Sequence, residues 1–398
     1  MNSDHEKFIL GNYSSPVLEV SASHGSVLQD SEGKEYLDFT SGIAVTNLGH
    51  GHPHWVKQVS AQAKKIVHCS NLFSIPEQVR LAKRLVELTA PGKMLFCNSG
   101  AEANEGLIKF ARLVAEQSSK KGKNKIIAAE NAFHGRTMGA LSATSSPKYR
   151  EGFEPLLDRF DFAPLNDLDA FSRKIDDGTI AVLIESIQGE GGIRVAEDHF
   201  LQGLAKLCRE RNCLLMLDEV QTGIARTGNF FGYQKSGIQP DAIAMAKGLG
   251  GGFPIGAIWV AEKWTEAFKP GSHGTTFGGS PLACSAANAV LDVIESEKLV
   301  EASREKGAVL HSGLTSLANS FSESVHEVRG RGLMLALVLR EDPSKLIASL
   351  RQKGLLVVAA AGNAIRFLPP LTASLPEIEK ALIITEEALK NFPTRVSE

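Results

Sequence analysis

The chain has 398 residues, 43% of them hydrophobic and 22% charged, which is typical of a soluble globular protein and leaves room for two or three domains, or for one large α/β core with a smaller appendage. A formal net charge of −2 without a basic block argues against nucleic acid as a partner. The N-terminal sequence mixes both charge signs without an apolar core, and the longest apolar run is too short to span a bilayer, so we expect neither a signal peptide nor a membrane contact.

The first expected element is a β-hairpin over residues 26–39, with its turn at Asp30–Gly33. From about residue 94, apolar strands alternate with helices in which apolar residues recur at i, i+3, i+4 and i+7. The strands are expected at 93–100, 125–130, 180–186, 213–220, 241–247 and 256–261, and the helices at 101–117 and 200–212. After Pro281 a long helix should be followed by strands at 332–339 and 365–371.

This alternation predicts an α/β fold with a mostly parallel sheet covered by helices on both faces. We expect a large domain over 51–280, and a smaller α+β domain built from the N-terminal segment 1–50 and the C-terminal segment 281–398.

Cysteine usage indicates the compartment. The five cysteines form no CxxC pair and lack metal-ligand spacing, so we expect no metal site. An odd, scattered set fits a reducing cytoplasm, with the thiols serving as small core residues. They stand at Cys69, Cys97, Cys208, Cys213 and Cys284.

Ligands of such sheets bind beyond the carboxyl ends of the strands, so the polar residues there belong together. Ser99 and Gly100 mark a strand-turn-helix junction, which suits either a phosphate or a simple helix cap. Asp218 and Glu219 follow an apolar strand and suit a helix cap, a metal ligand or a partner for a cationic atom. A Walker-type nucleotide site is disfavoured, because no glycine-rich loop ends in Gly-Lys-Ser/Thr.

Lys247 ends a small apolar run and is followed by four glycines within five positions. Burying a lysine charge is costly unless something pairs with it or takes its proton. The glycines bring the backbone close to a neighbour and leave room for a ligand.

Weighed singly, most of these residues suit ordinary structural roles. Together they match one ligand with a phosphate, a flat ring, a cationic ring nitrogen and a carbonyl carbon, and one substrate with a carboxylate. The matching residues are, in that order, Gly100, Ala101 and Thr276; Phe133; Asp218; Lys247; and, for the carboxylate, Arg136. Pyridoxal 5'-phosphate has the first four features, and an amino acid has the last.

The ordered set of motifs resembles the class-III aminotransferases of the fold-type-I pyridoxal-phosphate enzymes, and within that class it is most similar to the acetylornithine aminotransferases. The similarity runs almost end to end, from GKEYLDFTSGIAVTNLGHGHP through FCNSGAEANE, FHGRT, QGEGG, LDEVQTGIARTG, KGLGGGFPIGA and HGTTFGG to AIRFLPPLT. No single motif is decisive, but their order is highly specific.

The resemblance implies that Lys247 holds the cofactor as a Schiff base and then moves a proton, while Asp218 keeps the ring nitrogen protonated. It implies cofactor contacts by Ser99, Gly100, Ala101, Phe133, Asp218, Glu219, Val220, Gln221, Lys247 and Thr276. It places Arg136 and Thr275 near the substrate, Thr276 at the neighbouring subunit's cofactor in a homodimer, and Glu190 and Arg366 in a switchable ion pair.

The implied reaction is ping-pong transamination of N-acetylornithine with 2-oxoglutarate, a step of arginine biosynthesis. Ornithine δ-aminotransferase is the nearest alternative. It carries a tyrosine where this chain has Ile43, and an apolar residue suits an acylated amine better. Succinylornithine, succinyl-diaminopimelate and 4-aminobutyrate remain open as substrates. A non-catalytic phosphate- or nucleotide-binding protein and a cofactor-retaining isomerase are the alternatives from other classes.

Two positions depart from the family pattern. Ala225 stands where the family commonly has glycine, outside the expected contact set, and Trp259 is bulkier than expected.

Overall fold

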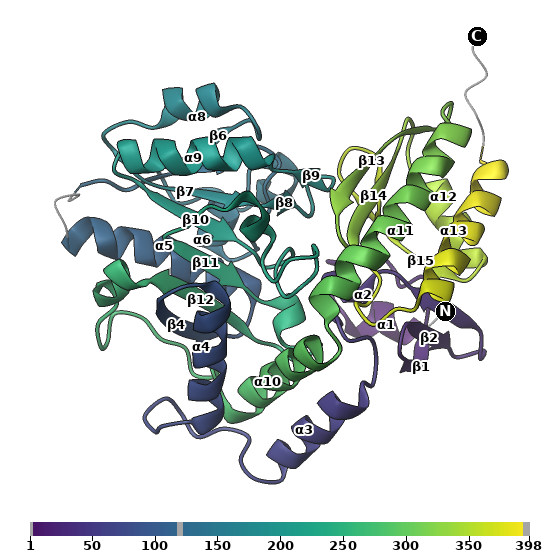
Figure 1. Cartoon of the computed structure of the whole chain (residues 1–398), viewed down its shortest axis with the longest axis horizontal. Coiled ribbons are helices and arrows are strands. Elements are labelled where there is room, and N and C mark those ends of the chain that lie inside the picture. Colours follow the sequence, from purple (N-terminus) through teal and green to yellow (C-terminus); the bar gives the residue numbers. More distant parts are fainter. Residues whose placement is uncertain (1–2, 118–121, 393–398) are drawn as a thin grey trace.

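The structure is a computed structural model that describes residues 3–117 and 122–392 (Figure 1). Its largest sheet has seven strands in the order β4-β12-β11-β10-β7-β5-β6. These strands span Gly92–Cys97 (β4), Lys125–Ala129 (β5), Phe160–Ala163 (β6), Thr179–Glu185 (β7), Leu214–Asp218 (β10), Ala242–Met245 (β11) and Gly256–Ala261 (β12). Only β12 runs against its neighbours. The predicted, mostly parallel α/β sheet is confirmed, although the short strand β6 was not predicted.

Both faces of this sheet are covered. Leu214 and Met216 of β10 belong to one buried cluster, while Leu215 and Leu217 belong to another, because successive side chains of a strand point to opposite faces. Helix α5 (Gly100–Gln117) packs on the first face and α9 (Asp198–Glu210) on the second. This double burial explains why the strands read as continuous apolar runs. Shorter helices are α6 (Met138–Ser142), α7 (Pro147–Arg150) and α8 (Leu168–Lys174), with 3₁₀ turns η1 (Gly232–Ser236), η2 (Lys247–Leu249) and η3 (Glu262–Ala267).

The C-terminal part forms a second region beside the large sheet (Figure 1). The helix expected after Pro281 is two helices, α10 (Pro281–Ser296) and α11 (Leu299–Ser320), separated where Lys298 adopts a φ of +49°. A four-stranded sheet with the order β13-β14-β17-β16 follows. The remaining bounds are Val325–Arg331 (β13), Met334–Leu339 (β14), Ser344–Gln352 (α12), Leu355–Leu356 (β15), Val358–Ala360 (β16), Ala364–Phe367 (β17) and Leu375–Lys390 (α13).

The N-terminal segment joins this second region. The predicted hairpin is confirmed as β2 (Val27–Asp30) and β3 (Glu35–Asp38), and β3 pairs in parallel with β15 from the far end of the chain. The other N-terminal elements are α1 (Ser3–Phe8), β1 (Val20–His24), the turn labelled α2 (Ser41–Ala44), α3 (Pro53–Ala63) and α4 (Pro76–Thr89). The domain limits at 50/51 and 280/281 stay a prediction. No described helix is both long and apolar enough to cross a membrane.

A buried arginine ties these regions together below the large sheet's carboxyl edge. The guanidinium of Arg226 is fully buried and donates to the carbonyls of Leu333 and Pro369 and to Oδ1 of Asn47, the last at 2.7 Å. Burial lowers the pKa of Arg226 to about 9. Asn47 in turn lies against Gly248, where a Cβ atom would approach the amide nitrogen to 2.1 Å. The segment around Lys247 is therefore held by contacts from both the N-terminal and the C-terminal parts of the chain.

Trp259 is a core residue of β12. Its side chain is fully buried, and the indole N–H donates to the carbonyl of Ala90 at 3.0 Å, at the end of α4. This side chain thus links the reversed strand β12, next to the sheet's edge, to the end of helix α4.

Candidate active site

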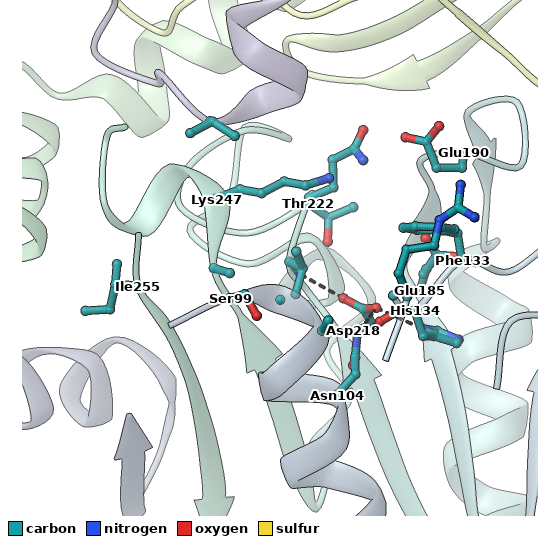
Figure 2. A pocket seen from close by; sticks show the side chains of 18 of the residues that line it. Ser99, Asn104, Phe133, His134, Glu185, Glu190, Asp218, Thr222, Lys247 and Ile255 are labelled. Atoms are coloured by element: carbon teal, nitrogen blue, oxygen red, sulfur yellow. Dashed lines mark hydrogen bonds and ion pairs between the residues drawn. The ribbon is translucent and has the colours of Figure 1, made fainter. Parts of the chain in front are cut away.

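A cavity of about 440 Å³ lies at the carboxyl ends of the parallel strands, where the sequence predicted a ligand (Figure 2). Each of the polar strand-end segments contributes to its wall. Of the predicted site residues, those that line it are Ser99, Gly100, Ala101, Phe133, Arg136, Glu190, Asp218, Val220, Gln221 and Lys247.

Asp218 is held rigidly at the end of β10. One carboxylate oxygen accepts from Nδ1 of His134 at 2.8 Å and from Nδ2 of Asn104 at 2.7 Å, and the other accepts from the backbone N–H of Val220 at 3.0 Å. The three side chains are almost completely buried. A fixed, desolvated carboxylate of this kind suits a cationic atom of a ligand.

Glu185 is a cavity residue that sequence reasoning left without a role. It ends β7 directly beside Asp218 in the parallel register, and its oxygens accept backbone N–H groups from Phe133 at 3.4 Å and from Gly189 at 3.3 Å. Burial, together with the charge of Asp218, raises the pKa of Glu185 well above its usual value. This shift favours the protonated, neutral form of the Glu185 carboxyl. The sequence feature that could have identified Glu185 as a site residue is its position at the end of a strand, like that of Asp218.

Lys247 follows β11, the strand adjacent to β10. The strand predicted to reach residue 247 ends at Met245, and Lys247 itself adopts a φ of +43°, which is an unusual conformation for a residue with a side chain. Burial, and then the charge of Arg366, lower the pKa of Lys247 to about 8. Near that pH a large share of the amine is neutral and able to act as a nucleophile or a base.

The start of α5 offers an anion site. Ser99 caps the helix, since its hydroxyl accepts from the N–H of Glu102 at 3.1 Å and its carbonyl accepts from that of Ala103 at 3.0 Å. The N–H groups of Gly100 and Ala101 belong to the first turn, which has no partner within a helix. A Cβ on Gly100 would approach Val220 to 2.7 Å, so only glycine allows this close packing of the turn against the wall.

Arg366 is buried next to the cavity and paired. Its Nη1 donates to Glu190 at 2.7 Å and to Oε1 of Gln221 at 2.9 Å, and its side chain is only 1% exposed. Although burial opposes it, the pairing with Arg366 lowers the pKa of Glu190, so the pair is ionic. Gln221 thus connects a predicted cofactor residue with the predicted ion pair.

Three predicted residues lie elsewhere. The carboxylate of Glu219 accepts from Thr222 at 2.6 Å and from the N–H groups of Gly232 and Tyr233, so this side chain supports the loop after β10 rather than the cavity. Thr275 contacts Asn98 at 2.9 Å outside the cavity wall, and Thr276 is exposed. A single chain does not bring these two threonines into the cavity.

A left-handed turn carries another part of the wall. Ser41–Ala44 all adopt positive φ values, between 46° and 66°. Asp38 accepts from the N–H groups of Thr40 and Ser41, at 2.9 and 3.2 Å, and the hydroxyl of Ser41 donates to the carbonyl of Leu368 at 2.6 Å. Val45, directly after the turn, lines the cavity. Ile43 is 38% exposed and does not line the cavity.

The family model for class-III aminotransferases matches residues 10–389. The chain belongs to the class-III aminotransferases. Acetylornithine aminotransferases from Caldanaerobacter subterraneus subsp. tengcongensis and Aquifex aeolicus are each 46% identical to it, and the alignments cover 97% and 96% of this chain and 98% and 100% of those relatives.

Solved structures of aminotransferases share the fold. An ornithine aminotransferase from Toxoplasma gondii has a TM-score of 0.94 at 30% identity, covering 97% of this chain and 93% of that one. An acetylornithine aminotransferase from Elizabethkingia anophelis has a TM-score of 0.87 at 32% identity, covering 98% and 97%. Backbone similarity therefore establishes the fold-type-I architecture but does not separate these two activities.

Class-III aminotransferases are pyridoxal-phosphate enzymes, and the cavity fits this cofactor. The donor set is right for its parts: free N–H groups at a helix start for the phosphate, a rigid carboxylate for the ring nitrogen, and a lysine of lowered pKa for the carbonyl carbon. Within the described ranges, no group of three or more His, Cys, Asp or Glu side chains is placed to hold a metal ion.

Replacing each of the two neighbouring carboxylates by its amide should have different effects on kcat. Asp218→Asn removes the charge that faces the ring nitrogen and should lower kcat by about a hundredfold or more. Glu185→Gln replaces a neutral acid by a neutral amide and should leave kcat almost unchanged. Steady-state kinetics with saturating cofactor test this, and equal losses in both variants would contradict the neutral state of Glu185.

Proposed function

We propose that this chain transfers the δ-amino group of N-acetylornithine to 2-oxoglutarate, giving N-acetylglutamate 5-semialdehyde and glutamate. The observation that carries the proposal is the Glu190–Arg366 pair beside a cavity that Arg136 also lines. The identity of 46% to acetylornithine aminotransferases over nearly the whole chain supports the choice of an acylated amino donor.

The chemistry is divided between cofactor and protein. Pyridoxal phosphate, when bound, supplies a carbonyl carbon for amine exchange and a ring that withdraws electrons from the reacting carbon. The N–H groups of Gly100 and Ala101 would hold its phosphate, and Asp218 would hold the proton on its ring nitrogen. The neutral amine of Lys247 would be the base that accepts the proton of the substrate carbon and later releases it.

The ion pair lets one site accept two unlike substrates. N-acetylornithine reacts at a carbon without a carboxylate, so an unpaired arginine beside that carbon would be a costly buried charge. Glu190 covers Arg366 in this half-reaction. The α-carboxylate of 2-oxoglutarate then takes the place of Glu190 on Arg366, while Arg136 binds the other carboxylate.

Ornithine aminotransferase activity is the second candidate, favoured by the fold similarity to the Toxoplasma gondii enzyme. Ile43 does not line the cavity, so the preference for an acylated amine rests on the identity to acetylornithine aminotransferases. We place the reaction in the cytoplasm, a compartment that suits the five free cysteines.

An amino-donor panel tests the activity. N-acetylornithine, ornithine, succinylornithine and 4-aminobutyrate are each assayed with 2-oxoglutarate, and N-acetylornithine should give the highest kcat/KM. Lys247→Ala should abolish turnover but retain non-covalent cofactor binding. A colourless wild-type protein without a borohydride-reducible adduct at Lys247 would support a non-catalytic phosphate-binding protein.

Removing the switch should separate the two half-reactions. In Glu190→Ala, Arg366 stays uncovered, so the glutamate half-reaction should hold or improve while the N-acetylornithine half-reaction weakens. Single-turnover absorbance measurements follow each half-reaction, with Glu190→Gln as the isosteric control. Equal losses in both halves, accompanied by a lower Tm, would indicate a permanent salt bridge.

We further propose a homodimer with shared sites. Thr276 is exposed and lies outside the cavity of its own chain. Phe277 beside it is 63% exposed, and Phe73 is 66% exposed. Large exposed apolar side chains next to a hydroxyl that the site needs fit a surface covered by a second copy. Thr276 would then bind the phosphate of the partner's cofactor.

Subunit mixing tests this sharing. Lys247→Ala lacks the lysine but supplies a normal Thr276, whereas Thr276→Glu keeps the lysine but repels a phosphate. Each homodimer should be impaired, and hybrids formed by mixing and refolding should regain one working site of two. Activity that stays at the sum of the separate variants, although hybrids are detected by mass, would refute a shared site.

A further inference from the structure

Tyr149 lies outside the cavity wall but contacts a substrate-binding side chain. It stands on the short helix α7 and is half-buried. The guanidinium carbon of Arg136 lies 4.4 Å from the centre of its ring. The ring of Phe133 meets it edge-on, with the ring centres 5.2 Å apart at 71°.

Arg136 needs such a support, because its side chain is exposed and long. No carboxylate of the described residues forms an ion pair with it, although Glu190 lines the same cavity. A guanidinium stacked on an aromatic face is held by the ring quadrupole, and this contact leaves the N–H donors at its edge free. A carboxylate partner would occupy those donors.

Tyr149 also stands within electrostatic range of all the charged substrate-binding groups. Burial, and then the charge of Glu190, raise the pKa of its phenol, while the charges of Arg136 and Arg366 act in the other direction. The phenol therefore stays neutral. The two arginines are thus supported differently: Arg366 by a carboxylate that can be exchanged, and Arg136 by the ring of Tyr149 at 4.4 Å and, further away, that of Phe133 at 5.8 Å.

We propose that Tyr149 is a positioning residue that holds the guanidinium of Arg136 ready for the substrate carboxylate. This inference rests on the proposed function only in assigning the carboxylate to Arg136. It predicts a contribution to KM, and to the kcat/KM of substrates with a carboxylate, but none to reactions of amines that lack one.

Graded fluorination tests the ring while keeping its shape. Phenylalanine and its mono-, di- and trifluorinated forms are incorporated at position 149 of the full-length holoenzyme, which weakens the ring quadrupole stepwise. For N-acetylornithine and for 2-oxoglutarate, KM should rise stepwise, to about tenfold overall if the stacking is worth about 1.4 kcal/mol. The kcat, and the single-turnover rate with n-butylamine, should stay constant.

Side-chain variants complete the test. Tyr149→Phe keeps the ring and should resemble wild type, whereas Tyr149→Leu should raise KM. In an Arg136→Met background, Tyr149→Leu should cost no further kcat/KM, because the two residues act as one unit. Lys148→Met is the matched control, since this exposed lysine approaches the same ring at 5.9 Å and should have no effect.

The outcomes separate the two hypotheses. A wild-type enzyme inactive with N-acetylornithine refutes the proposed function. An active wild type in which fluorination has no effect, or slows n-butylamine equally, shows that Tyr149 only supports Phe133 and the local fold, and overturns the inference. The inference is also overturned if Tyr149→Leu lowers kcat/KM by the same factor in the Arg136→Met background as in the wild type.

Discussion

Three neighbouring strands place two carboxylates and one amine in a single desolvated space, and the site depends on how their charges are balanced. Glu185, Asp218 and Lys247 follow from the register of β7, β10 and β11. Burial, and then the charge of Asp218, raise the pKa of Glu185 and so favour its neutral form. Asp218 has His134, Asn104 and Val220, whereas Glu185 has only two longer backbone contacts. Lys247, beside the Arg366 cation, gives up its own proton more readily for the same reason.

The second region of the chain contributes a charged side chain, Arg366, to the surroundings of the cavity. Arg366 comes from β17, and its ion pair reaches Glu190, which lies in the segment after β7 and lines the cavity. Arg226 makes a second, fully buried junction by using only neutral acceptors. Arg226 therefore has no counter-ion that could be displaced, whereas Arg366 is paired with Glu190, which a substrate carboxylate can replace.

Periodicity predicted helices α5 and α9 and most strands of the large sheet, because a strand and a helix with a buried face have different apolar repeats. The helices α4, α12 and α13 were not predicted, although each has buried residues on one face. Periodicity also failed at β6, which is only four residues long, and at the reversed direction of β12, since direction leaves no mark in composition. Strand ends identified most cavity residues. The side chain of Glu219 turns to the loop after β10, because the sequence cannot say which of two adjacent side chains faces the cavity. The stacking of Tyr149 on Arg136 needed coordinates, and so did the φ of +68° at Ala225, which explains why glycine is usual there.

The left-handed turn at Ser41–Ala44 leaves its third position open to evolutionary change. Side chains in this conformation are strained, yet the backbone here is fixed by Asp38 and by the contact between Ser41 and Leu368, neither of which involves Ile43. Residue 43 can therefore mutate without refolding the loop, two positions before the side chain that lines the cavity. Sequences that share this turn can therefore vary at position 43 while the hydrogen bonds of Asp38 and Ser41 are inherited unchanged.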